Sequence, residues 1–77
     1  MDRHDQVIQA IGEQCDRAAK ESQDAWSRGV TETARQADNE YFRVVRLYHA
    51  HVLRKSVDLG LTELRDEDRV LLRFIKN

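Results

Sequence analysis

The sequence has 77 residues, of which 40% are hydrophobic and 35% are charged, and its formal net charge at pH 7 is −1. This composition is typical of a soluble, helix-rich protein, and a chain of this length forms at most one small domain. Its single cysteine excludes an intramolecular disulfide. No apolar run has the length of a signal-peptide core or a membrane span, so we expect a cytoplasmic protein.

The first predicted element is an amphipathic helix over about residues 3–28. Small and apolar residues recur there at alternating steps of four and three, the spacing of one helix face with a coiled-coil-like seam. This stripe consists of His4, Ile8, Ile11, Cys15, Ala18, Ser22, Ala25 and Gly29. Gly12 opposes helix formation by about 1 kcal/mol. Its presence suggests that another element approaches closely at this position.

A second helix is predicted over about residues 31–57. Gly29 suits the residue after a helix C-terminus, and Thr31 can cap the helix that follows. The stripe of this second helix consists of Ala34, Ala37, Tyr41, Val44 or Val45, Tyr48 and Val52. An alternative stays open, because another stripe with a period near 3.6 residues runs from Cys15 to Tyr48 across the glycine. The sequence therefore also allows one continuous helix over residues 3–57.

A shorter third helix is predicted over about residues 63–76, extending to the end of the sequence. Thr62 or Asp66 is expected to cap it, since the acidic residues that follow favour the positive end of the helix dipole. Its buried face is expected to consist of Leu64, Leu71, Phe74 and Ile75.

These elements predict an all-α fold, an antiparallel hairpin of two long helices plus the short C-terminal helix. In a hairpin that turns at Gly29, residues face each other where their numbers add up to about 59. Ala25 then faces Ala34, and Ile8 faces Val52. The turn is lined with small side chains and the open end with large ones, so we expect the third helix to dock at the open end.

The large apolar residues are unevenly divided between the two halves of the chain. Five precede position 41 and seventeen follow it, and residues 41–48 are apolar nearly all round. A helix of that kind is normally buried on several sides, and the uncovered apolar area favours association. We therefore expect a homo-oligomer, above all a dimer, or a dedicated protein partner. The candidate interface consists of Trp26, Tyr41, Phe42, Val45, Leu47, Tyr48 and Leu53.

The sequence contains no motif for catalysis, cofactor binding or metal binding, so we expect neither an enzyme nor a cofactor. Cys15 lies on the buried stripe and is interpreted as a core thiol. His49 and His51 point about 200° apart on a helix and cannot chelate one metal together. Trp26 is expected either to close the hairpin tip or to anchor in a partner's pocket.

Arginines form two candidate phosphate-binding stripes, which consist of Arg43, Arg46 and Arg54 and of Arg65, Arg69 and Arg73. Such stripes would suit a dimer that binds nucleic acid. We favour instead that they pair with the acidic first helix, within the chain or across a dimer, because residues 1–40 carry a net charge of −4 and residues 41–77 one of +3. The favoured hypothesis is a non-enzymatic helical interaction module, a small regulator or adaptor; nucleic-acid binding is the alternative.

Overall fold

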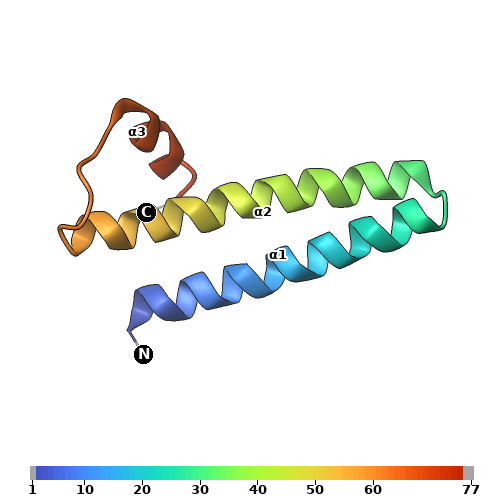
Figure 1. The fold of residues 1–77 in the computed structure, drawn as a ribbon, viewed down its shortest axis with the longest axis horizontal. Helices are drawn as coiled ribbons and strands as arrows, with labels where there is room; N and C mark the ends of the chain where they lie inside the picture. The colour runs from blue at the N-terminus through green and yellow to red at the C-terminus, as the bar shows by residue number, and fades with distance from the viewer. Residues whose placement is uncertain (1, 76–77) are drawn as a thin grey trace.

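The computed structural model describes residues 2–75 and contains three helices in that range, α1 (Arg3–Ser27), α2 (Thr31–Asp58) and α3 (Asp66–Leu72). The helices α1 and α2 lie antiparallel as a long hairpin, and the chain then returns so that α3 lies over α2 (Figure 1). The molecule measures 46 × 30 × 20 Å. This arrangement confirms the predicted all-α hairpin and excludes one continuous helix over residues 3–57.

The two long helices begin and end within one residue of their predicted bounds. Asp2 precedes α1, and its Oδ1 accepts a hydrogen bond from the backbone N–H of Asp5 (2.9 Å), which satisfies one of the free donors at the helix start. No helix in residues 2–75 combines the length and the hydropathy needed to cross a membrane.

Gly29 ends α1 in a left-handed conformation, with φ +74°. Its N–H donates to the carbonyl of Trp26 (3.2 Å) and the N–H of Val30 donates to that of Ala25 (3.0 Å), the hydrogen-bond pattern of a Schellman motif. Val30 also accepts the first hydrogen bond of α2, from Ala34 (2.9 Å). The prediction that Thr31 caps α2 is therefore wrong. The turn is so short that the last residue of the motif directly precedes the helix.

The third helix is shorter than predicted, covering Asp66–Leu72 instead of 63–76. Gly60, with φ +73°, ends α2, and residues 61–65 form an irregular connection. Neither Thr62 nor Asp66 is the cap. The helix starts after Arg65, whose N–H donates to Asp68 Oδ2 (3.1 Å). The N–H groups of residues 73–75 donate to carbonyls three residues back, so the chain leaves α3 in tight turns. Position 76 lies outside the described residues.

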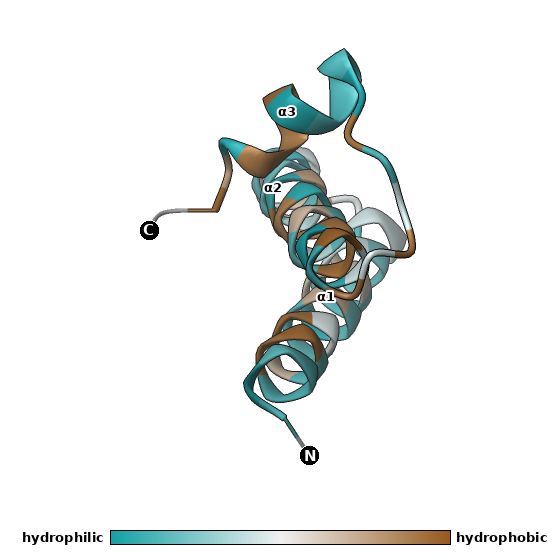
Figure 2. Ribbon diagram, turned by 90° about the vertical axis from the view of Figure 1, so that its left-hand side faces the viewer, coloured by the Kyte–Doolittle hydropathy of each residue, from teal (hydrophilic) through white to brown (hydrophobic). Residues whose placement is uncertain are grey.

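The interior of the hairpin consists mainly of alanine. The buried residues in the described part of the chain are Ile11, Ala18, Ala25, Ala34, Ala37, Val44 and Ala50. Val44, 1% exposed, has the largest fully buried side chain. Figure 2 shows the hydrophobic part of α3 next to α2. Even so, Leu64 and Phe74, which were predicted to be buried, are largely exposed.

The register of the hairpin differs by one residue from the prediction. Cross-helix contacts join Asp5 to Lys55, Gly12 to Tyr48 and Ser22 to Asp38, and each pair of residue numbers adds up to 60. Val52, predicted to face Ile8, is 37% exposed. Ala50 is buried instead. It lies one turn from both Arg46 and Arg54, which contact Phe74 and line the hollow with Arg69, so it shares the side of α2 next to the α3 segment. The predicted stripe followed a single face of α2 and therefore missed this second contact.

Candidate interaction surfaces

One side of the α1–α2 seam is hollowed along much of its length. A first hollow of about 580 Å³ lies between the part of α1 around Gly12 and Cys15 and the aromatic side of α2. A second hollow lies nearer the tip, and Tyr41 lines both. We call this surface the aromatic groove and define it by its large α2 side chains, Tyr41, Phe42, Val45 and Tyr48.

The aromatic groove sets large side chains on α2 beside small residues on α1. The Tyr48 ring lies over Gly12, where an added Cβ would stand 3.6 Å from Tyr48 Cε2. Phe42 packs edge to face against Tyr41, with 5.7 Å between ring centroids, and is nevertheless 58% exposed. The groove therefore holds large, partly exposed side chains of α2 among polar residues, which include Glu13, Asp16 and Asp38.

Trp26 links the two helices at the tip end of the hairpin. Its indole N–H donates to Asp38 Oδ2 (3.1 Å), and the hydroxyl of Ser22 donates to the other oxygen of the same carboxylate. The indole is still 49% exposed. The structure therefore shows Trp26 closing the tip, while its role as an anchor for a partner stays a prediction.

The remaining two candidate interface residues lie elsewhere. Leu47 and Leu53 are half-buried, and neither lines the aromatic groove. The candidate interface predicted from sequence thus divides: four residues line the aromatic groove, Trp26 lies at the tip, and Leu47 and Leu53 lie outside both.

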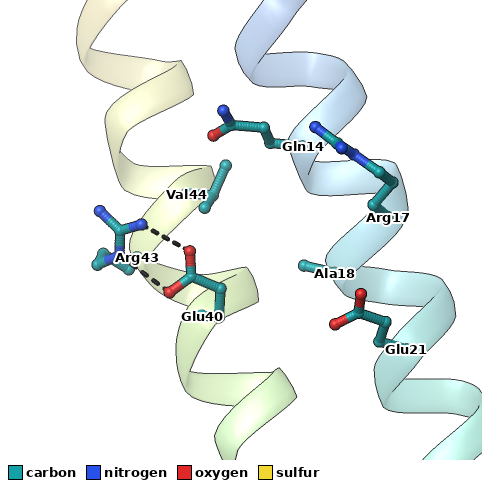
Figure 3. Close-up of a pocket in the computed structure, with 7 residues that line it drawn as sticks. All are labelled: Gln14, Arg17, Ala18, Glu21, Glu40, Arg43 and Val44. Carbon is teal, nitrogen blue, oxygen red and sulfur yellow. Dashed lines mark hydrogen bonds and ion pairs between the residues drawn. The ribbon is translucent and has the colours of Figure 1, made fainter.

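The other side of the seam is polar (Figure 3). There Arg43 holds Glu40 through two hydrogen bonds, from Nε to Oε2 (3.1 Å) and from Nη2 to Oε1 (2.6 Å). These hydrogen bonds lower the pKa of Glu40 and raise that of Arg43. Arg43 therefore differs from the other candidate phosphate-binding arginines, because its guanidinium group already donates to both carboxylate oxygens of Glu40.

Three of those arginines surround one hollow between α2 and α3. We call it the arginine hollow: Arg54 comes from α2, Arg69 from α3 and Arg73 from the C-cap of α3, and Leu72 and Ile75 complete the lining. Of the other candidates, Arg46 stacks on the Phe74 ring, 5.9 Å from its centroid, and Arg65 immediately precedes α3. One member of the first predicted stripe therefore lies beside two members of the second.

The acidic first helix does not neutralise these arginines within the described chain. Among residues 2–75 the ion pairs between α1 and α2 are Lys55 with Asp5 and His4 with Asp58 (3.0 Å from Nε2 to Oδ2). Neither involves a candidate arginine, so the expected intrachain pairing with the first helix is not observed.

The sulfur and imidazole groups of residues 2–75 do not gather into a metal-ligating cluster. Cys15 is half-buried in the aromatic groove, and burial together with the nearby charge of Asp16 raises its thiol pKa. A raised pKa leaves less of the reactive thiolate at neutral pH. In the part of the chain that the structure describes, no three metal-ligating side chains come together.

Comparisons with protein-family models, with curated protein sequences and with solved structures find no match to this chain. Its function is therefore argued from its own residues.

Proposed function

We propose that this chain is a non-enzymatic helical interaction module that self-associates, with a dimer as the basic unit. In this proposal the aromatic groove is the contact between copies. The assembled form would act as a small regulator or adaptor by presenting its remaining surfaces to a protein partner.

The observation that carries the proposal is the contrast between the alanine interior and the exposed large side chains. Five of the seven buried residues in the described chain are alanines. Nine large apolar residues are between 37% and 74% exposed, and Phe42 and Trp26 are among them. Burial contributes about 25 cal/mol per Å² of apolar surface, and alanine has little surface to bury. A small domain of this kind gains most of its missing stability from association.

The shape of the groove supports a second copy as the occupant. A twofold dimer presents the same patch from both copies, so the patch must complement itself. Here Tyr41 and Phe42 form a ridge of aromatic side chains beside the small residues Cys15 and Ala19 of α1. Gly12 is already covered by Tyr48 of the same copy. A twofold axis can set the ridge of each copy against the small residues of the other. Two hairpins joined in this way form a four-helix bundle.

The test is the mass in solution, measured by light scattering over a dilution series. Phe42→Ser removes the most exposed aromatic side chain of the groove, and we expect it to weaken the dimer roughly tenfold or more. Leu61→Ser is the matched control, because Leu61 is 74% exposed but lies in the α2–α3 connection. Circular dichroism verifies that both variants stay helical.

The expected result is a dimer for the unmodified chain and for Leu61→Ser, with Phe42→Ser dissociating at higher concentration. If the unmodified chain is monomeric at every concentration, the result contradicts the proposal of self-association. Equal dissociation of the two variants contradicts the choice of the aromatic groove.

A further inference from the structure

The arginine hollow brings three positive charges together from two helices. Arg69 in α3 and Arg73 at its C-cap are four residues apart, and Arg54 approaches from α2, which α3 covers (Figure 1). The nearest ion-pair partner is Asp58, with Oδ1 3.6 Å from Arg54 Nε. Within residues 2–75 no carboxylate lies at ion-pair distance from Arg69 or Arg73. Of the three arginines only Arg54 has an ion-pair partner, although Asp66, Glu67 and Asp68 stand in the first turn of α3.

A bound anion offsets the cost of placing like charges together. Asp58 serves this purpose poorly, because its other oxygen lies 3.0 Å from His4 and its charge is shared between two partners. All three cationic groups are guanidinium groups, whose planar forks bind phosphate oxygens in pairs. Leu72 and Ile75 are the apolar residues of the lining, and the three arginines are exposed, so a ligand reaches them from solvent.

We propose that the arginine hollow is a binding site for a phosphate group. A tetrahedral phosphate has enough oxygens to accept hydrogen bonds from three guanidinium groups at once, whereas a carboxylate has only two oxygens. The phosphate can belong to a small molecule or to a nucleic-acid backbone, and the chemistry of recognition is the same. The site is distinct from the aromatic groove, so it does not depend on self-association.

Binding at this site is coupled to the position of α3. Arg54 belongs to α2, and Arg69 and Arg73 to α3 and its C-cap, so the three surround one ligand only while α3 lies on α2. A ligand that binds only this state stabilises it by mass action. We therefore expect phosphate to stabilise the docking of α3, and slower amide hydrogen exchange in residues 66–72 to report it.

The experiment titrates the full chain with inorganic phosphate at constant ionic strength, maintained with chloride. The signals are the NMR resonances of the arginine Nε–H groups and of the α3 amides. A second arm uses a single-stranded oligonucleotide at two salt concentrations, since backbone binding weakens steeply with salt. Both arms are repeated in the Phe42→Ser background, so that failure of the proposed dimer and failure of this site are distinguishable.

The test variant is Arg69→Gln with Arg73→Gln, and its matched control is Arg17→Gln with Arg35→Gln. The control removes two exposed arginines outside the arginine hollow and changes the net charge equally. We expect saturable shifts at Arg54, Arg69 and Arg73, with at least roughly tenfold weaker binding in the test variant and little change in the control. Saturation by inorganic phosphate identifies a free phosphate group as sufficient. Salt-dependent saturation by the oligonucleotide alone identifies the backbone as the source.

The proposal is overturned if neither probe gives a saturable shift, or if the control pair weakens binding as much as the test pair. It is also overturned if the test pair changes only the dissociation constant of self-association. In that case the hollow contacts acidic residues of a second copy.

Discussion

Gly12 lies inside α1, directly beneath the Tyr48 ring. An alanine Cβ there would stand 3.6 Å from Tyr48 Cε2, which is ordinary van der Waals contact. We therefore predict that Gly12→Ala raises the free energy of unfolding by about 0.5–1 kcal/mol, since alanine is the better helix former. Urea unfolding followed by circular dichroism, at one fixed protein concentration, measures the change.

The control for this prediction is Ala10→Gly, which makes the reverse change at an exposed position of the same helix. It is expected to lower the free energy of unfolding by a similar amount. A loss of stability in Gly12→Ala would instead mean that the approach of Tyr48 requires glycine, as the sequence first suggested.

At the scale of single residues, periodicity predicted most of the α1 side of the interior. Ile11, Ala18 and Ala25 all belong to the predicted stripe and are buried. The bond from Trp26 to Asp38 was not predicted, because it joins residues on two helices and depends on the exact register. An error of one residue in register rotates a helix by about 100°, which is enough to misplace such a contact.

The α1–α2 turn is the element whose sequence signal was clearest. Gly29 has φ +74°, and no atom lies within 4 Å of a Cβ added there, so substitution strains only the backbone. We predict that Gly29→Ala lowers the free energy of unfolding by about 1 kcal/mol, the cost of a left-handed alanine. In a continuous helix the same substitution would stabilise by a similar amount, so the sign of the change distinguishes the two folds.

Arg28→Ala is the neighbouring control for the turn. Arg28 is exposed and has φ −86°, a right-handed conformation that alanine adopts without strain. Chemical denaturation is expected to show little change for this variant. A stabilising effect of Gly29→Ala would contradict the turn that the structure shows.

The third helix shows why local sequence signals were insufficient at the scale of elements. Its acidic residues predicted a start near residue 63, yet isolated helices shorter than about 12 residues are marginal in water. Of the described residues in the predicted range, only 66–72 are helical, and the segment packs on α2. Leu61 and Leu64 stay exposed in the connection. Packing therefore determines the length of α3 more than its capping residues do.

At the scale of the molecule, the sequence predicted an excess of apolar surface but not how it is distributed. Tyr41, Phe42, Val45 and Tyr48 gather on one side because the hairpin places α1 beside them. The arginine hollow could not be predicted from the periodicity of each helix alone, because it forms only when α3 returns across α2. Both candidate surfaces depend on tertiary contacts between segments that are distant in the sequence.

The open end of the hairpin makes the stability of the whole molecule depend on pH. Burial lowers the pKa of His51, and the nearby positive charge of His4 lowers it further, below the ordinary value of 6.5. Between the lowered pKa of His51 in the folded chain and its ordinary value of 6.5 in the unfolded chain, the unfolded chain binds more protons than the folded chain. The contribution of neutral His51 is therefore complete above pH 6.5 and is lost as the pH falls through the lowered folded-state pKa.

We accordingly predict a lower free energy of unfolding at pH 5 than at pH 7.5, measured by urea unfolding at equal ionic strength. His51→Gln is expected to reduce this difference, because glutamine has no proton to gain. An identical pH dependence in His51→Gln and the unmodified chain would show that burial of His51 does not control it.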